Sequence, residues 1–195
     1  MSTTQIAILD IDQLAAASDA LATVYGAAFA QPPYNEPEEA SGHFAQILRR
    51  NAASPPAGFR CCVARADGGA FVGFGYGFTY GPGTSRYDLL AKALAPEPPE
   101  VAARWLDDAF DLVELAVHPS AQGQGIGARL HDALLEGQPH RPAVLTAYDG
   151  ETVAMRLYRS RGWAPISGQI FFPGGTEPHL VLGLGLARWR ETSNR

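Results

Sequence analysis

Cysteine and methionine are scarce in this chain of 195 residues, which contains two of each. The two cysteines, Cys61 and Cys62, are adjacent. Neighbouring side chains on a strand point to opposite faces, so a disulfide between these two would be strained. The sequence therefore excludes a disulfide framework. We expect two buried, reduced thiols and a cytoplasmic protein.

Long apolar runs and an excess of basic residues are also missing. Asp10 and Asp12 interrupt the N-terminal segment early, so we expect no signal peptide and no membrane span. The formal net charge of −5 argues against nucleic acid or an anionic membrane as a partner. The same charge is compatible with a cationic substrate such as an amine.

The overall composition is that of an ordinary globular protein, with 46% hydrophobic and 18% charged residues. The sequence shows no internal repeat, low-complexity tract or interdomain linker. We therefore expect a single domain over residues 1–195, with residues 81–110 as an insertion before a central strand.

The pattern of apolar residues predicts the order of the elements. In the first part of the chain we expect a strand at 4–9, a helix from a cap at Asp12 to about Phe29, a helix at 37–51, and a hairpin of strands 59–66 and 70–80. In the second part we expect helices at 87–95, 101–109, 127–136 and 151–161 and strands at 111–118, 143–147, 163–166, 169–172 and 179–186. Residues 173–176 would connect the last two strands, and the polar tail after Ala187 would fray.

A glycine-rich turn lies between the strand predicted at 111–118 and the helix that follows it. Gly123, Gly125 and Gly127 alternate over five residues there. Such a turn leaves backbone N–H groups bare at a helix N-terminus, where the orphan donors and the helix dipole favour an anion. The turn therefore predicts a ligand that carries phosphate.

Two classes of ligand fit this turn. The spacing Gly123-x-Gly125-x-x-Ala128 satisfies the loose dinucleotide fingerprint, with Asp149 as a candidate ribose ligand. The spacing Gln122-x-x-Gly125-x-Gly127 resembles the turn Gln/Arg-x-x-Gly-x-Gly/Ala of the GNAT family of acyl-CoA N-acyltransferases, and this resemblance implies coenzyme A as the ligand. The dinucleotide interpretation fits less well, because four residues separate the strand from the first glycine and the motif lies past the midpoint of the chain.

A second motif decides between the two ligands. Residues 154–163, Ala-Met-Arg-Leu-Tyr-Arg-Ser-Arg-Gly-Trp, resemble the signature Ala-x-x-Leu-Tyr-x-x-x-Gly-Phe of the GNAT family of acyl-CoA N-acyltransferases. Together the two motifs make residues 111–166 similar to that family. The resemblance implies an α/β fold with a mixed, mostly antiparallel central sheet and helices on both faces. It also implies acetyl transfer from acetyl-CoA directly to an amine, without a metal.

The resemblance also implies which residues contact the coenzyme. The backbone of Leu115, Ala116 and Val117 would pair with pantetheine. The backbone amides of the turn would face the pyrophosphate; they belong to Gln122, Gly123, Gln124, Gly125, Ile126, Gly127 and Ala128. Arg129 either adds a cation at the phosphates or is a solvated helix residue. Glu151 stands where the family often has an asparagine that orients the coenzyme, which puts that one contact in doubt.

Two side chains are the candidates for catalysis. Tyr158 matches the family tyrosine near the coenzyme sulfur, and a phenol is a plausible acid for a leaving thiolate. Glu114 lies in an apolar strand, where an ionised carboxylate costs free energy unless it is solvated or paired. It is the candidate base for an ammonium acceptor. The same role stays open to three other carboxylates: Asp107, Asp108 and Asp111. His118, before Pro119, is expected to be a loop residue.

The predicted function is therefore acetyl transfer to an amine, with a small molecule favoured over a protein as acceptor. The aromatic residues of the loop at 31–35, with Tyr80 and Tyr87, are candidates for its pocket. Two alternatives stay open: a non-catalytic module that binds acyl-CoA, and a protein that binds a nicotinamide dinucleotide. A homodimer is compatible with the sequence, which does not decide the oligomeric state.

Overall fold

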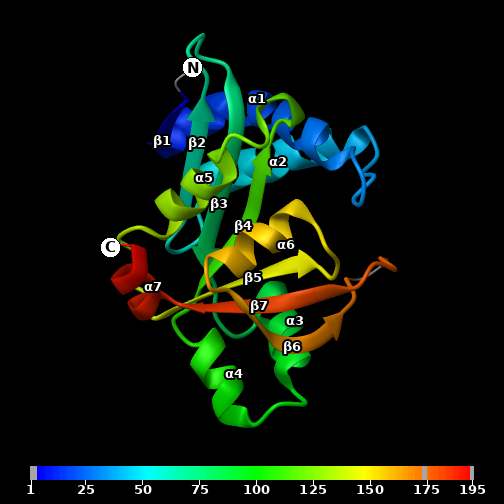
Figure 1. Ribbon diagram of the computed structural model, residues 1–195, viewed down its shortest axis with the longest axis vertical. Helices are drawn as coiled ribbons and strands as arrows, with labels where there is room; N and C mark the ends of the chain where they lie inside the picture. Colours follow the sequence, from blue (N-terminus) through cyan, green and yellow to red (C-terminus); the bar gives the residue numbers. More distant parts are fainter. Residues whose placement is uncertain (1–3, 173–174, 194–195) are drawn as a thin grey trace. The chain divides into compact units, whose positions relative to one another are not determined.

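The computed structural model describes residues 4–172 and 175–193, drawn as a ribbon in Figure 1. The chain divides into two compact units, which are described here one at a time. The first unit comprises the residues up to Gly77 and Glu114–Glu136. The second comprises Phe78–Val113 and the residues from Gly137 onward. One domain over residues 1–195 stays a prediction.

The first unit begins with β1 (Gln5–Leu9) and α1 (Ile11–Phe29), followed by α2 (Glu39–Ala53), β2 (Arg60–Arg65) and β3 (Phe71–Thr79), whose last two residues belong to the second unit. The prediction that Asp12 caps α1 was wrong. Asp10 accepts a hydrogen bond from the Gln13 amide at 2.8 Å, and the Gln13 side chain accepts one from the Asp10 amide at 3.1 Å. This reciprocal capping box satisfies two donors at once, which Asp12 inside the helix cannot do.

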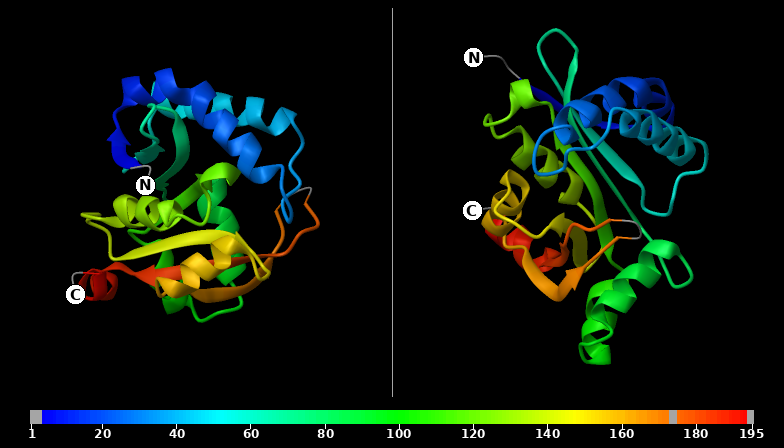
Figure 2. Two further views of the ribbon diagram at one scale, coloured as in Figure 1. Left: turned by 45° about the horizontal axis from the view of Figure 1, so that its top comes forward. Right: turned by 90° about the vertical axis from the view of Figure 1, so that its right-hand side faces the viewer.

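The strands of the first unit lie between two layers of helix (Figure 2). Helices α1 and α2 pack side by side over one face, where Phe44 of α2 contacts the rings of Phe74 and Tyr76 on β3. Helix α5 (Ile126–Leu135) covers the other face. Phe74 and Tyr76 face α1 and α2. Because successive residues of a strand face opposite sides of the sheet, the α-carbons of Gly73 and Gly75 present their open side to α5. A β-carbon at Gly75 would lie 2.8 Å from Leu134 of that helix.

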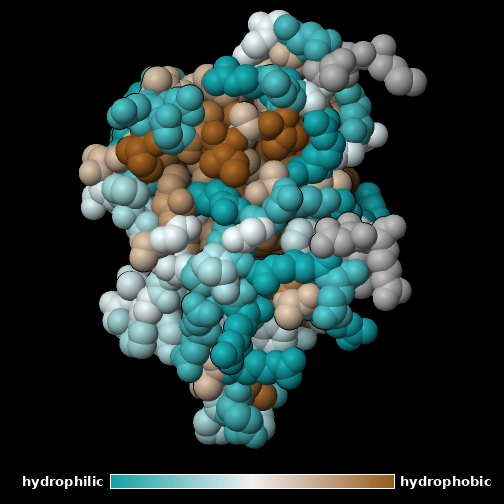
Figure 3. All heavy atoms as spheres, turned by 90° about the vertical axis from the view of Figure 1, so that its left-hand side faces the viewer, coloured by the Kyte–Doolittle hydropathy of each residue, from teal (hydrophilic) through white to brown (hydrophobic). Residues whose placement is uncertain are grey.

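Strand β1 lies at the edge of the sheet and pairs only with β2, in antiparallel register. Its residue Ile8 is 57% exposed. Figure 3 shows the side of the molecule on which β1 lies, and apolar residues gather in its upper half.

The second unit contains α3 (Ser85–Leu94), α4 (Pro99–Leu106), β5 (Pro142–Tyr148), α6 (Val153–Ser160), β6 (Ala164–Ile170), β7 (His179–Gly185) and α7 (Leu186–Ser193). Figure 1 shows α6 in front of β5 and β7, with α3 behind them. Leu90 and Leu94 of α3 pack in one buried cluster with Val144 of β5 and Val181 of β7. Residues 81–110 thus contain two helices, α3 and α4, which pack into an apolar core, and their description as an insertion stays a prediction.

Strand β4 (Phe110–Val117) continues from the second unit into the first. It pairs with β5 in parallel at Phe110 and Asp111, whereas β5 with β7 and β7 with β6 pair antiparallel. The strand order is β1-β2-β3-β4-β5-β7-β6. This sheet is mixed and mostly antiparallel, which confirms the predicted fold class. It is not the doubly wound parallel sheet that the dinucleotide alternative requires.

Two predictions near the C-terminus were wrong. The strands expected at 163–166 and 169–172 are one strand, β6, whose register against β7 shifts between Pro165 and Gln169. Within the described residues, the chain after Ala187 continues α7 as far as Ser193, where the prediction was a frayed tail. Trp189 is buried there, and Arg190 donates hydrogen bonds to the carbonyl oxygens of Gln138 and His140. The predicted connection at 173–176 falls partly outside the described residues.

A buried ion pair holds α3 to the sheet of the second unit. The carboxylate of Asp111 is fully buried and accepts two hydrogen bonds from Arg86, at 2.7 and 3.1 Å. The same guanidinium donates to the Thr146 hydroxyl at 3.2 Å. A buried carboxylate is tolerated when its charge is paired and its oxygens are hydrogen-bonded, and Arg86 supplies both.

Replacement of Arg86 by methionine should destabilise the protein by about 3–5 kcal/mol, because it leaves the Asp111 charge buried and unpaired. Urea unfolding at neutral pH measures this change. Arg49→Met is the matched control: its pair with Asp19 is exposed, so its loss should cost at most about 1 kcal/mol. Equal effects of the two substitutions would show that Asp111 does not depend on Arg86.

Candidate functional site

The glycine-rich turn is the most distinctive local geometry in the first unit. Gly123 and Gly125 both have φ of 74°, the left-handed region that glycine adopts without strain. Gly125 is the residue that precedes α5, and no side chain caps that helix. A β-carbon at either glycine would meet no atom within 4 Å. The turn is therefore an open backbone surface at a helix N-terminus, as an anion site requires.

The ends of this turn are fixed by burial and by local hydrogen bonds. Ala121 and Ile126 are buried on its two sides, whereas residues 122–125 are exposed. The Gln122 side chain folds back and donates to the carbonyl oxygen of Val117 at 3.0 Å. Sequence reasoning assigned Gln122 to the coenzyme and missed this bond, by which its side chain ties the turn to the end of β4.

Two residues near the turn have structural roles. His118 accepts a hydrogen bond from the Ser120 amide at 3.3 Å, and its ring nitrogen lies 2.8 Å from the Ser120 hydroxyl. It is a loop residue, as expected. Arg129 donates to the Thr4 carbonyl at 2.7 Å and so ties α5 to the start of β1.

The second half of β4 places Glu114 on the face of the sheet opposite α5. A β-carbon at Gly75 would lie 2.9 Å from the Leu115 side chain and 3.2 Å from the Glu114 carbonyl oxygen. Leu115 therefore points toward α5, and alternation directs Glu114 toward the face covered by α1 and α2. The Glu114 carboxylate also accepts a hydrogen bond from the Leu115 amide at 3.3 Å.

Tyr25 of α1 lies in the electrostatic neighbourhood of Glu114. Burial is the main cause that raises the pKa of Tyr25 well above its usual value, and the negative charges of Glu114 and Glu36 raise it further. The phenol therefore stays protonated at any physiological pH. Its neutral hydroxyl therefore lies within the electrostatic fields of Glu114 and Glu36.

Tyr158 lies on α6 in the second unit and is only 6% exposed. Its ring stands edge-on to Trp163 at a centroid distance of 6.0 Å. Thr152 caps the helix by accepting a hydrogen bond from the Met155 amide at 3.0 Å, and Gly162, with φ of 86°, ends it. The cap and the packing hold the Tyr158 side chain in a defined position.

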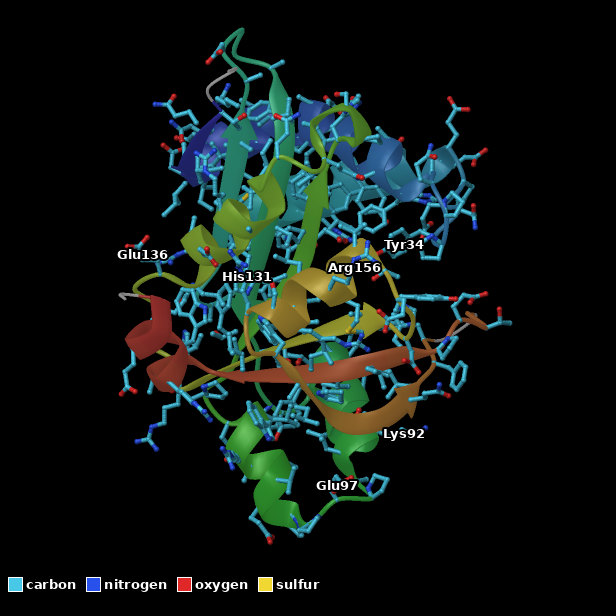
Figure 4. All side chains as sticks on the ribbon, in the orientation of Figure 1. Tyr34, Lys92, Glu97, His131, Glu136 and Arg156 are labelled. Carbon is cyan, nitrogen blue, oxygen red and sulfur yellow. The ribbon has the colours of Figure 1, made fainter. Side chains whose placement is uncertain are left out.

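Glu151, the departure from the family pattern, is exposed and paired within its own helix region. Its carboxylate forms an ion pair with Arg159, and its carbonyl oxygen accepts from Arg156. The extra negative charge is therefore offset locally. Figure 4 shows Arg156 on α6.

The carboxylates that competed with Glu114 lie in the second unit and differ in their surroundings. Asp111 is held by Arg86 in the buried ion pair. Asp108 lies 2.8 Å from a ring nitrogen of His140, and Asp107 is exposed at the end of α4. Asp111 and Asp108 therefore have structural partners. Of the four candidates, Glu114 alone lies in the same unit as the glycine-rich turn.

The two cysteines are fully buried on β2 and form no disulfide. Burial raises the pKa of both thiols, to about 12 for Cys62. Both are therefore protonated at neutral pH, and neither supplies the thiolate that covalent catalysis needs.

Metal ligands and membrane segments were sought in the described ranges, 4–172 and 175–193. Within them no group of three or more His, Cys, Asp or Glu side chains is arranged to hold a metal ion. None of the described helices combines the length and the apolarity that a membrane span requires.

The family model for the acetyltransferase (GNAT) domain matches residues 57–165, more than half of the chain. This match includes β4, the glycine-rich turn and α6. The GCN5-like protein acetyltransferase Rv2170 of Mycobacterium tuberculosis is 30% identical over 126 residues, which are 62% of this chain and 61% of that protein. The chain thus matches about three fifths of this relative's length.

Solved structures share the fold. An acetyltransferase of the GNAT family from Bacillus cereus superposes with a TM-score of 0.61 at 11% identity, over 94% of this chain and 97% of the other. The ribosomal-protein-S18-alanine N-acetyltransferase of Escherichia coli gives 0.60 at 16% identity, over 94% of each chain. At such low identity the likeness concerns the fold alone.

Proposed function

This chain belongs to the GNAT family of acetyltransferases, and we propose that it transfers the acetyl group of acetyl-CoA directly to the nitrogen of an amine. The observation that carries the proposal is the open turn at Gly123 and Gly125, where backbone donors precede α5 without a side-chain cap. That surface fits a pyrophosphate, because a bulky anion can approach it without meeting a β-carbon.

The coenzyme contacts follow the two motifs. The backbone at Leu115, Ala116 and Val117 pairs with pantetheine, and the amides of residues 122–128 hold the pyrophosphate. Gln122 contributes through its backbone, because its side chain is bonded to Val117. Acetyl-CoA supplies an activated acyl group, so the chain needs to provide only position and proton transfer.

Two side chains move the protons. Glu114, directly or through water, takes a proton from the ammonium of the acceptor. The freed nitrogen attacks the thioester carbonyl carbon, and the carbon–sulfur bond breaks. Tyr158 donates its proton to the leaving thiolate, a role that suits a protonated phenol. The attacking nitrogen loses its second proton as the amide forms, and this proton passes through water to the Tyr158 phenolate. Glu114 releases the first proton to solvent, so both side chains return to their starting states. No covalent enzyme intermediate is needed, which agrees with the buried, protonated state of Cys61 and Cys62.

We favour a small-molecule amine as acceptor. The net charge of −5 suits a cation. The name of the Mycobacterium tuberculosis relative says that it acts on protein, so a protein amine is the competing acceptor. A panel of small amines and lysine peptides, assayed by thiol release, distinguishes the two.

Replacement of Gly125 by valine should nearly abolish binding of acetyl-CoA, because the side chain fills the approach to the turn and strains a left-handed backbone. Calorimetric titration with acetyl-CoA measures the loss. Gly69→Val is the matched control: Gly69 has φ of 81° and also faces open space, but it lies in the β2–β3 turn. If folded Gly125→Val binds as the parent protein does, the turn is not the coenzyme site.

Removal of the Tyr158 hydroxyl in Tyr158→Phe should lower kcat by roughly 100- to 10,000-fold if the phenol is the general acid. The affinity for acetyl-CoA should change little, because the ring and its packing on Trp163 are kept. Single-turnover kinetics, with chemistry shown to be rate-limiting, makes the measurement. An unchanged rate would reduce Tyr158 to a packing residue.

Replacement of Glu114 by glutamine should alter the ionisation through which activity rises with pH. The variant should recover part of its activity at high pH, where free amine is abundant and a base is needed less. The pH dependence of kcat/KM for both proteins provides the comparison. A profile identical to the parent's would assign proton removal to another carboxylate or to bulk water.

A further inference from the structure

Helix α5 carries no charged residue of its own at either end. Within this helix, which the structure describes in full, the first turn holds no acidic residue and the last turn holds no basic residue. The carbonyl groups at the end of a helix carry partial negative charge and need donors or cations from elsewhere. The start of α5 is the surface at which we propose the pyrophosphate. Whatever holds the other end of the helix therefore bears on the coenzyme.

Arg60 of β2 supplies hydrogen-bond donors to the C-terminal end of α5. Its Nη1 atom donates to the carbonyl oxygen of Leu134 at 3.1 Å and also to that of Glu136. Figure 4 labels Glu136, the residue that directly follows α5. Arg60 is partly buried and lies at the start of its strand. One guanidinium from the sheet thus serves the helix end that has no cation of its own.

A second side chain of β2 contacts the backbone of the same helix. The Cys62 thiol donates to the carbonyl oxygen of Leu130 at 3.3 Å. Arg60 and Cys62 are two residues apart on the strand, so both face α5. A thiol is a weak donor that acts mainly as a small apolar group. The stronger directional contact between β2 and the helix is therefore that of Arg60.

Apolar packing alone does not fix the position of α5 along its own axis. Leu130 and Leu134 are fully buried, and their burial sets the distance between the helix and the sheet. Apolar contacts are non-directional, whereas a hydrogen bond needs its oxygen within a narrow range of distance and angle. The two bonds from Arg60 therefore fix the axial position of α5, and with it the position of the glycine-rich turn.

The length of α5 decides whether Arg60 acts through its charge or through its hydrogen bonds. Ten residues of helix at about 1.5 Å each span about 15 Å. The Debye length at physiological ionic strength is about 8 Å. The turn is exposed, so little of the Arg60 charge reaches an anion there. The position of the helix, and not the charge of the guanidinium, carries the effect.

We propose that Arg60 is a positioning residue for acetyl-CoA: it holds α5 from the sheet and so places the backbone donors of the glycine-rich turn where the pyrophosphate needs them. The inference rests on the proposed function, since it takes the turn as the coenzyme site. Arg60 lies at the opposite end of α5 from that turn. Its effect therefore falls on coenzyme binding and not on the chemical step.

Arg129 also ties α5 to the sheet, but it provides a less selective test. Its guanidinium donates to the Thr4 carbonyl at 2.7 Å. Arg129 is only four residues from Gly125, about one helical turn, so its replacement also removes a charge beside the proposed anion site. Replacement of Arg60 changes the anchor of the helix and leaves the surroundings of the turn intact.

Arg60→Met removes both hydrogen bonds and keeps an unbranched apolar stem. The Kd for acetyl-CoA, measured by calorimetry, should rise roughly two- to thirtyfold, the range expected when a residue acts through a packed element. The ratio of Kd values between variant and parent should persist at high salt. At saturating acetyl-CoA, kcat should change by less than about twofold, because Glu114 and Tyr158 do not lie on α5.

A shortened acyl donor separates positioning from general damage. S-acetylpantetheine carries the same thioester as acetyl-CoA but lacks the pyrophosphate. Relative to the parent, Arg60→Met should have a lower kcat/KM with acetyl-CoA and an unchanged kcat/KM with S-acetylpantetheine. Equal losses with the two donors would show that Arg60 only stabilises the protein, which would overturn the proposal.

Arg65→Met is the matched control on the same strand. Arg65 donates to the Gly69 carbonyl at 3.3 Å and lies 3.9 Å over the ring of Phe71, both within the β2–β3 hairpin. This variant should keep the parent's Kd for acetyl-CoA. An equal rise of Kd in Arg65→Met and Arg60→Met would contradict a specific role for Arg60.

Two milder variants of Arg60 complete the test. Arg60→Lys keeps a flexible stem with three donors, so it should recover most of the affinity for acetyl-CoA. Arg60→Gln keeps a donor on a shorter side chain and replaces the methionine variant if that variant does not fold. It should show the same selective loss with acetyl-CoA, at smaller size, and no such loss would overturn the proposal.

The outcomes distinguish this inference from the proposed function. If the parent protein binds acetyl-CoA and folded Arg60→Met binds it equally tightly, Arg60 has no positioning role and the acetyltransferase function stands. If the parent protein neither binds acetyl-CoA nor releases thiol from it, the proposed function fails, and the inference that rests on it fails as well.

Discussion

The close approach of β3 to β4 determines the geometry of the first unit. A β-carbon at Gly73 would lie 3.1 Å from the Ala116 carbonyl oxygen, and one at Gly75 would lie 3.2 Å from that of Glu114. These contacts would be tighter than nine in ten that real β-carbons make, so glycine at both positions relieves crowding between the strands. The closeness packs Leu115 against α5, and alternation then directs Glu114 to the aromatic face. The candidate base is therefore placed by two residues that carry no functional group.

Most of the fold could be predicted because the helices and strands repeat their apolar residues with the expected periods. The central strand, the turn and α5 were located within one residue, since glycines and a proline mark their borders. The errors near the C-terminus arose where a tertiary contact outweighed the local pattern. The bulge in β6 depends on pairing with β7, and α7 is held by bonds from Arg190 to the chain near residue 140. Local composition carries no sign of either contact.

The sequence motifs predicted which segments form the candidate site, but they did not predict the hydrogen-bond partners of its polar side chains. Two sequence motifs indicated the turn and Tyr158. Each motif lies within one short continuous segment, so the spacing of its residues can be read directly from the sequence. The partners of polar side chains were not predictable, since they come from distant segments. Arg86 is 25 residues from Asp111, and no pattern connects them before folding. The bond from Gln122 to Val117 is local, but an exposed glutamine has no preferred partner in a sequence.

The surroundings of Glu114 are compatible with the role of proton acceptor that we propose for it. A carboxylate offers about four lone-pair sites, so the hydrogen bond from the Leu115 amide orients it without exhausting its capacity. Tyr25, kept protonated by burial and by the nearby negative charges, adds a neutral hydroxyl within the field of the Glu114 charge.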